Sequence, residues 1–263
     1  MSIEKVVIMP HPPIALPEVA GPRFNEVNKT AGGMKQLAKD IMQLQPETVI
    51  VITPHSNMHR SAFAVFVEPK ITSSFVMFGA PQVQLSYKND LDFIQILNEV
   101  RHEKGKTDLV QIKPGTLLDH GCGVPLYYLS NAGYKGNVVA INYSMADIAC
   151  HKDFGQSLLK ASNRADQKII LVASGDLSHR ITPFAPAGFH PDGEKFDQII
   201  VKAVETGNYE EIININPSLR QNAGECAYNS LMVALGALSD RPESNKVYSY
   251  EAPFGVGYLV ASL

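Results

Sequence analysis

Runs of apolar residues alternate with amphipathic stretches along nearly the whole chain. Residues 48–53 (TVIVIT) and 169–173 (IILVA) are unbroken and rich in β-branched residues, which is the pattern of strands buried on both faces of a sheet. Residues 31–45 instead carry apolar side chains at helical spacing, until Pro46 ends the pattern. Strands that alternate with helices in this way indicate a largely parallel sheet. The pattern therefore predicts an α/β fold.

No low-complexity block, repeat or long linker divides the sequence. We therefore expect a single α/β domain over residues 1–263, with a mostly parallel central sheet flanked by helices. The predicted strands are 6–9, 48–53, 63–67, 75–78, 138–143, 169–173 and 258–262. The predicted helices are 31–45, 89–101, 124–129, 152–163, 193–206 and a last helix that opens at Glu225.

Composition narrows the class of protein. The formal net charge of −3 provides no basic surface that would indicate nucleic-acid binding. The three cysteines are an odd number without a CxxC pair, which fits a reducing compartment better than a disulfide framework. The N-terminal apolar run is too short for a secretory signal, and no apolar stretch is long enough to span a bilayer. We therefore expect a soluble cytoplasmic protein with no membrane partner and, if it associates, a homodimer, the commonest oligomer.

Residues suited to metal and acid–base chemistry stand where predicted strands end or helices begin. They are His11 (MPHPP), His55 (ITPHS), His120 (LLDHGCG), His179 (SGDLSHR) and Glu225 (AGECAYNS). In open α/β sheets ligands bind beyond the carboxyl ends of the strands, so residues far apart in the sequence can meet in one cleft. We expect these five side chains to share a site.

Two histidines and one carboxylate are the usual ligands of a non-haem ferrous ion that uses dioxygen. Three protein ligands leave the opposite positions of the metal open for substrate and for O2. The charge of such a site is positive, which favours an anionic bidentate substrate such as a catecholate. His11 and His55 are the predicted nitrogen ligands, each just past a strand. Glu225 is the predicted carboxylate, at the first turn of a helix whose dipole favours negative charge.

The two remaining candidate histidines, His179 and His120, suit roles other than metal ligation. His179 follows the strand 169–173 in a loop that can place its imidazole over a pocket, and histidine titrates in the range that general acid–base catalysis needs. His120 stands beside Gly121 and Gly123, which permit close approach of the backbone to a ligand. These features make His179 a candidate acid–base residue and His120 a candidate for contact with a ligand.

Simpler interpretations exist for each residue taken alone. His11 could be a turn residue, His55 a helix cap, and His120 a hydrogen-bonded turn histidine. Glu225 alone would be read as a helix-start carboxylate. No short fixed spacing links the candidates in the way that HExxH does. Cys226, next to Glu225, is expected to be a small buried side chain rather than a ligand.

The same segments, in the same order and over almost the whole chain, resemble the class III extradiol ring-cleavage dioxygenases of the LigB type. PHPP matches the segment with the first iron histidine, ITPHSN the second, DHG an active-site histidine, SGDLSH the acid–base histidine and AGEC the carboxylate. By this resemblance the ligands of Fe(II) fall on His11, His55 and Glu225, and His179 and His120 are catalytic. The resemblance implies a LigB-like fold and ring opening of a catecholic or aminophenolic substrate by O2.

A narrower resemblance is to the LigB-like proteins of the AmmeMemoRadiSam group, carried by PHPPIALPEVAGP, FHPDGEKFD and PFGVGYLVA. That group has Memo-like relatives, in which a cysteine takes the third ligand position and ring cleavage is not established. Glu225 at that position, beside Cys226, favours the dioxygenase type. The alternatives are a Memo-like metal-binding protein with a regulatory or partner-binding role, and a zinc-dependent hydrolase. The identity of the aromatic substrate is not encoded in these motifs.

Overall fold

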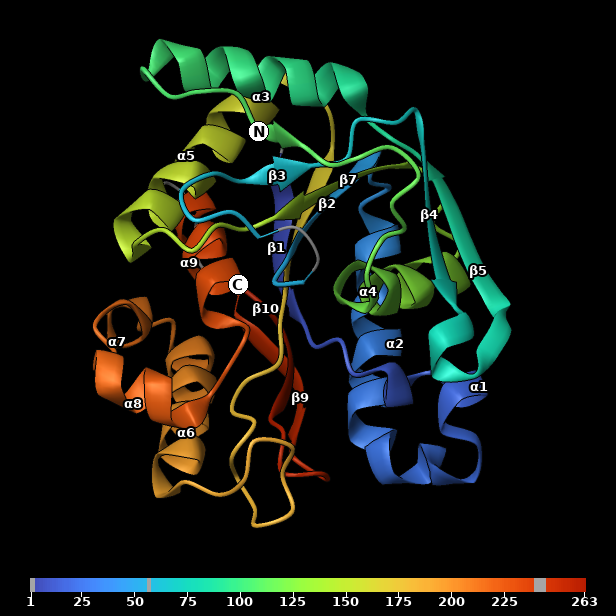
Figure 1. Cartoon of the computed structure of the whole chain (residues 1–263), viewed down its shortest axis with the longest axis vertical. Helices are drawn as coiled ribbons and strands as arrows, with labels where there is room; N and C mark the ends of the chain where they lie inside the picture. Colours follow the sequence, from blue (N-terminus) through green and yellow to red (C-terminus); the bar gives the residue numbers. More distant parts are fainter. Residues whose placement is uncertain (1–2, 56–57, 239–244) are drawn as a thin grey trace.

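A computed structural model describes residues 3–55, 58–238 and 245–263 of the chain. A sheet of eight strands in the order β6-β3-β7-β2-β8-β1-β10-β9 runs through its centre (Figure 1). Its strands are β1 (Ile3–Met9), β2 (Thr48–Thr53), β3 (Ala64–Val65), β6 (Val110–Gln111), β7 (Asn137–Asn142), β8 (Ile169–Ser174), β9 (Lys246–Glu251) and β10 (Tyr258–Ser262). A separate antiparallel hairpin consists of β4 (Lys70–Phe75) and β5 (Ala80–Lys88).

The middle of the sheet is parallel and its margins are mixed. Strands β7, β2, β8 and β1 are parallel neighbours. On one side β10 and β9 add antiparallel strands, and on the other β3 is antiparallel to β7. The predicted α/β domain with a large central sheet flanked by helices is confirmed. The parallel order matters for the site, because it brings the carboxyl ends of β1, β2 and β8 to the same edge.

Helices cover both faces of the sheet (Figure 1). They are α1 (Pro17–Ala20), α2 (Asn28–Gln43), α3 (Leu91–Glu103), α4 (His120–Asn131), α5 (Ile148–Ala165), α6 (Pro191–Thr206), α7 (Tyr209–Ile213), α8 (Pro217–Ala223) and α9 (Tyr228–Ala237), with 3-10 turns η1 (Pro13–Ala15), η2 (Gly21–Val27) and η3 (Val76–Phe78). Alternate residues of β2 serve two cores: Ile50 and Ile52 pack with α3, α5, α6 and α9, and Val49 and Val51 pack with α2 and α4. This two-sided burial explains why the strand is an unbroken apolar run.

Several local predictions were wrong. Residues 75–78 are not a strand: β4 ends at Phe75, and η3 then closes at Gly79, whose φ of 78° turns the chain into β5. The helix predicted at 124–129 already begins at His120, where the Asp119 side chain accepts a hydrogen bond from the Cys122 amide. The last helix begins at Tyr228 rather than at Glu225. Within the described residues, no helix combines the length and apolar character needed to cross a membrane.

Candidate metal centre and active site

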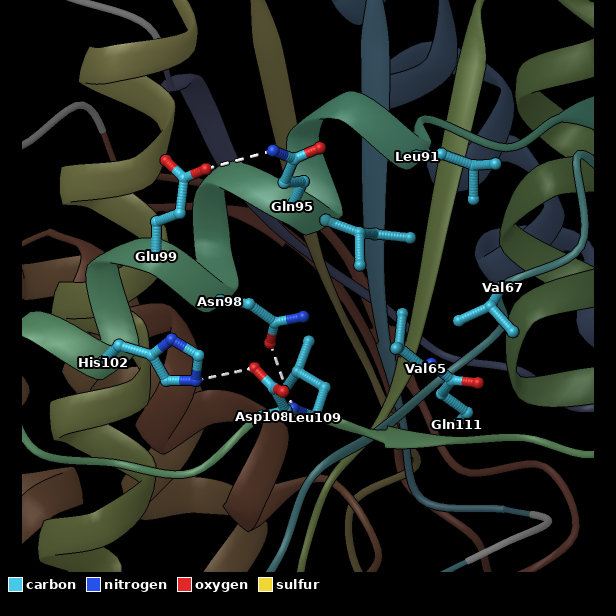
Figure 2. Close-up of a pocket in the computed structure, with 11 residues that line it drawn as sticks. Val65, Val67, Leu91, Gln95, Asn98, Glu99, His102, Asp108, Leu109 and Gln111 are labelled. Carbon is cyan, nitrogen blue, oxygen red and sulfur yellow. Dashed lines mark hydrogen bonds and ion pairs between the residues drawn. The ribbon is translucent and has the colours of Figure 1, made fainter.

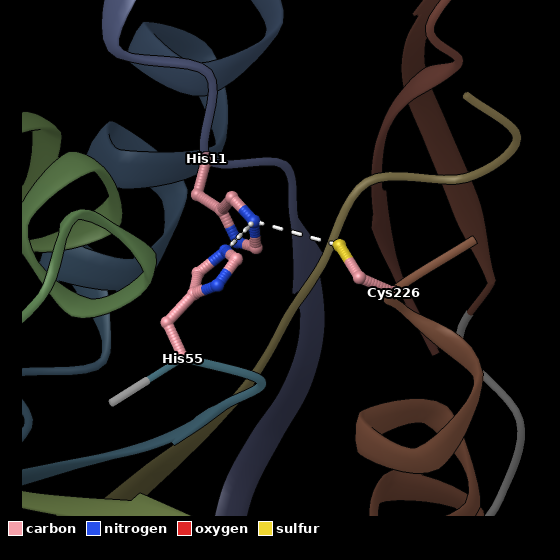
Figure 3. Close-up of side chains that lie close together, drawn as sticks. All are labelled: His11, His55 and Cys226. Atoms are coloured by element: carbon pink, nitrogen blue, oxygen red, sulfur yellow. Dashed lines mark hydrogen bonds between the residues drawn. The ribbon is translucent and has the colours of Figure 1, made fainter. Parts of the chain in front are cut away.

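Three potential ligand atoms converge where β1, β2 and α9 approach one another (Figure 3). His11 follows β1, His55 follows β2, and Cys226 precedes α9. The two imidazole Nε2 atoms lie 3.0 Å apart, and the Cys226 Sγ lies 3.6 Å from the His11 Nε2. All three ligand atoms lie within 4.8 Å of one another, a separation that one metal ion can bridge.

The donor set fits a transition metal. Imidazole nitrogen binds iron, zinc, copper and nickel, and thiolate favours the softer of these ions. Burial, and then the positive charge that His55 would carry, holds the pKa of His11 well below its ordinary value, so this imidazole is neutral and has a lone pair to donate. Burial raises the pKa of the Cys226 thiol well above its ordinary value. Ligation by Cys226 therefore requires the metal itself to displace the thiol proton.

Glu225 is held elsewhere. Its carboxylate accepts hydrogen bonds from Arg220 Nε at 2.6 Å and from the Tyr228 amide at 2.5 Å. Arg220 also donates to Asn229 and stacks over the Tyr228 ring, and Arg220 and Glu225 both line a cavity of about 400 Å³. Among the described residues, the structure does not bring Glu225 into the ligand group, and Cys226 provides the third atom instead. Glu225 as a ligand stays a prediction that requires its carboxylate to leave Arg220.

His120 lies against the two predicted nitrogen ligands. Its ring centroid is 4.2 Å from that of His55 and 5.3 Å from that of His11. Burial, with the positive charge that His55 would carry as a second cause, lowers the pKa of His120 to about 4. The imidazole is therefore neutral near pH 7. The Phe78 ring meets it edge-on at 5.5 Å, so the tip of the β4–β5 hairpin forms an aromatic wall beside the group.

His179 is held by the segment that leads to Cys226. Its amide donates to the Ala223 carbonyl, and its Nδ1 lies 2.7 Å from the Gly224 carbonyl oxygen. A carbonyl oxygen can only accept, so Nδ1 carries the hydrogen and Nε2 keeps a free lone pair. Burial is the main reason why the pKa of His179 lies below its ordinary value. A neutral imidazole with a free Nε2 can act as a general base.

Buried carboxylates tie the loop after β8 to its surroundings. Asp176 accepts a hydrogen bond from the His11 amide at 2.9 Å, and burial raises its pKa to about 7. Asp197 on α6 accepts from the Ser178 amide and from the Tyr250 hydroxyl, both at 2.8 Å. The Asp176 side chain thus bridges the loops that follow β8 and β1. These contacts hold the backbone that leads from β8 to His179, the candidate base.

Another cavity, of about 400 Å³, lies between α3 and the sheet edge at β3 and β6 (Figure 2). Leu91, Ile94 and Leu109 give it apolar walls, and on its rim the exposed His102 Nε2 lies 2.8 Å from an Asp108 carboxylate oxygen. None of the predicted site residues is among the described residues that line it. This cavity is therefore separate from the site predicted from the sequence.

The sequence reasoning set aside or missed three residues of the candidate site. Cys226 was considered and judged a buried side chain. Ser174, the last residue of β8, hydrogen-bonds His11, but it looks like the polar end of an apolar run. Phe78 was assigned to a strand. The one signal that could have found Cys226 is its position beside Glu225, since either residue could face the same cleft.

Comparison with known proteins finds one family whose model matches nearly the whole chain. The family described as "Catalytic LigB subunit of aromatic ring-opening dioxygenase" matches residues 5–261. Protein CA_C1420 of Clostridium acetobutylicum is 34% identical over 271 residues; the match covers 100% of this chain but 58% of that relative, so the chain spans little more than half of it.

Two relatives of lower identity carry the names of dioxygenases. The 3,4-dihydroxyphenylacetate 2,3-dioxygenase of Escherichia coli is 24% identical over 250 residues, which are 90% of each protein. The 4,5-DOPA dioxygenase extradiol of Mirabilis jalapa is 24% identical over 227 residues, 81% of this chain and 82% of the relative. The crystal structure of uncharacterized protein JW3007 from Escherichia coli K12 superimposes with a TM-score of 0.65 at 16% identity, covering 98% of both chains, and shows a shared fold.

Proposed function

The chain belongs to the family of the catalytic LigB subunit of aromatic ring-opening dioxygenases, and from this premise we propose that it is a non-haem Fe(II)-dependent extradiol dioxygenase. Its substrate would be a small catecholic or aminophenolic ring, opened with O2. The observation that carries the proposal is the gathering of His11, His55, His120 and His179 at one edge of the sheet.

His11 and His55 would hold the metal, because their Nε2 atoms face one another and are neutral donors. In the present arrangement Cys226 completes the set, and Glu225 would do so if its carboxylate turned away from Arg220. Bound Fe(II) would supply open positions for the substrate oxygens and for O2, and a route for electrons between them. The buried walls of the site would exclude competing water.

His179 and His120 would handle the protons. The free Nε2 of His179 can take a proton from a substrate hydroxyl as the substrate binds in its anionic form, and can return that proton later in the reaction. His120, neutral and beside His55, can orient the substrate or donate a hydrogen bond to oxygen on which negative charge develops. Neither role requires a charged imidazole at the start of the cycle.

Phe78 is expected to contact the substrate ring. It is 37% exposed and lies edge-on to His120, where an aromatic ring bound at the metal could stack. An aromatic pair contributes about 0.5–1.5 kcal/mol, so Phe78→Ala should raise KM for an aromatic substrate about 2- to 10-fold. Met77→Ala is the matched control, because Met77 lies on the same turn but is 87% exposed. An unchanged KM in Phe78→Ala, measured by steady-state kinetics, would remove Phe78 from the substrate wall.

A second function is favoured by one observation, the Cys226 sulfur at the third ligand position. A His-His-Cys set is the arrangement that resemblance to Memo-like proteins implies, with a metal-binding role but without ring cleavage. In that case the chain would bind metal tightly and catalyse no oxygen-dependent ring opening. This candidate differs from the dioxygenase in a directly measurable property.

Oxygen uptake tests the proposal. The protein is reconstituted anaerobically with Fe(II) and then mixed with aerated solutions of catechols and aminophenols, with metal-free protein as the control. We expect uptake of one O2 per ring opened, together with a coloured product. Absence of uptake over the whole panel by protein that demonstrably holds iron would contradict the dioxygenase proposal and favour the Memo-like function.

A further inference from the structure

Ser174, the last residue of β8, has a fully buried hydroxyl that lies between His11 and the start of α4. Its Oγ lies 2.5 Å from the Gly121 carbonyl oxygen and 2.8 Å from the His11 Nδ1. Gly121 belongs to the first turn of α4, next to His120. The hydroxyl therefore connects the helix that carries one site histidine to the ring of another.

The directions of these two hydrogen bonds follow from the chemistry of the atoms. The Gly121 carbonyl oxygen can only accept, so it takes the single hydroxyl hydrogen of Ser174. The Ser174 Oγ must then accept the second bond, and the hydrogen in that bond must be on His11 Nδ1. A neutral imidazole has one N–H, so in the neutral ring this arrangement leaves the His11 Nε2 without a hydrogen. That bare Nε2 is the atom that faces His55 Nε2 at 3.0 Å and Cys226 Sγ at 3.6 Å.

The backbone at Gly121 is closely packed against β2. A Cβ at Gly121 would lie 2.3 Å from the Thr53 Oγ1 and 3.2 Å from the His55 Cδ2. Thr53 in turn donates to Asp119, whose side chain caps α4. The acceptor for the Ser174 hydroxyl therefore lies in closely packed backbone between the end of β2 and the start of α4.

We propose that Ser174 is a positioning residue that locks His11 in the Nδ1–H tautomer, so that Nε2 is presented as the metal ligand. The inference rests on the proposed metal site for its purpose, but the tautomer itself is a property of the metal-free protein. It also assigns His55: in the absence of metal, the His55 Nε2 faces a bare nitrogen at 3.0 Å and must carry a hydrogen. Ligation of a metal through the His55 Nε2 would require that hydrogen to be on Nδ1 instead, while His11 would need no rearrangement.

Long-range ¹H–¹⁵N NMR of histidine-labelled, metal-free protein tests the lock directly, since the nitrogen shifts and couplings distinguish the two tautomers. The His11 and His55 signals are assigned from the variants His11→Gln and His55→Gln. We expect Nδ1–H at His11 and Nε2–H at His55. A His11 ring that is Nε2–H in the wild-type protein overturns the inference.

If Ser174 presents the His11 Nε2 to a metal, its loss should weaken metal binding. Affinity for Zn²⁺, measured by competition with a chromophoric chelator, tests this consequence. Ser174→Ala should bind Zn²⁺ about 10- to 100-fold more weakly, the usual effect of removing the partner that orients a metal-bound histidine. Ser230→Ala is the matched control, because it removes an equally buried hydroxyl that donates to the Ser174 carbonyl oxygen and not to His11. Equal affinities in the two variants would contradict the positioning role.

These measurements also separate the inference from the proposed function. Nδ1–H at His11 in a wild-type protein that binds neither Zn²⁺ nor Fe(II) would sustain the tautomer lock and refute the metal site. Metal binding and oxygen uptake in a protein whose His11 is Nε2–H would refute the tautomer lock and support the metal site. Far-UV circular dichroism and thermal unfolding establish that Ser174→Ala and Ser230→Ala are folded before their affinities are compared.

Discussion

Replacing His179 with alanine should leave metal binding intact and lower turnover by about 10²- to 10⁴-fold, the usual contribution of a general acid–base group. The expectation follows from the position of the ring. His179 is hydrogen-bonded through Nδ1 to the Gly224 carbonyl, it is not among the three residues whose ligand atoms converge, and its Nε2 lone pair is free. Steady-state oxygen uptake gives kcat, and the iron content of the same samples gives the occupancy.

The matched variant is His179→Gln, which keeps a side chain that can bond the Gly224 carbonyl but cannot accept and return a proton as imidazole does. Both variants should lose turnover, and a glutamine variant as slow as alanine would identify proton transfer rather than packing as the lost function. Turnover near the wild-type value in His179→Ala would exclude the acid–base role. Loss of iron in that variant would instead show that His179 supports the ligands.

The fold was predictable where burial on both faces leaves a continuous apolar run. β2 matches its predicted range, and β8 is one residue longer than its own predicted range. Both are central strands that helices cover on both faces. The hairpin tip was not predictable in this way. Residues 75–78 are apolar like a strand, but Gly79 turns the chain at positive φ, and Met77 stays exposed. Hydrophobicity alone does not reveal that Val76 and Met77 are exposed and that Phe78 lies against His120.

The candidate site was predictable at the level of the strand ends. Because β1, β2 and β8 are parallel neighbours, His11, His55 and the loop carrying His179 had to meet at one edge of the sheet. The choice between Glu225 and Cys226 was not predictable, because adjacent residues point to different sides of the chain. Arg220, on the preceding helix, binds the carboxylate, and no local pattern in the sequence announces that contact.

The third ligand is decided by a pair of single substitutions. Cys226→Ser should lower the affinity for Zn²⁺ and Fe(II) by more than about 100-fold, because loss of a ligand exceeds the 10- to 100-fold effect of losing a ligand's hydrogen-bond partner. The expectation follows from the sulfur, which lies 3.6 Å from the His11 Nε2 within the group of convergent atoms. Serine keeps the size of the side chain but is a poor replacement for a thiolate donor.

Glu225→Gln should leave the affinity within a few-fold of the wild-type value and act on stability instead. The amide can still accept from the Tyr228 backbone, but it leaves Arg220 facing a neutral group in a contact where the Glu225 side chain is 3% exposed and the Arg220 side chain 29%. Breaking a buried ion pair costs about 3–5 kcal/mol, and the partial exposure of Arg220 places the expected loss below that range. Chelator competition and denaturant unfolding of the same variant separate the two effects.

The reverse outcome is equally informative. If Glu225→Gln loses the metal while Cys226→Ser keeps it, the carboxylate turns from Arg220 to the ion when metal binds, and the two-histidine, one-carboxylate set of the ring-opening enzymes is restored. If Cys226→Ser loses the metal, the ion has a thiolate ligand, and thiolate donates more charge to iron than carboxylate does. If the protein with this thiolate ligand still consumes O2 with catechols, ring opening tolerates sulfur at the third ligand position. If it binds metal without consuming O2, it has the Memo-like function.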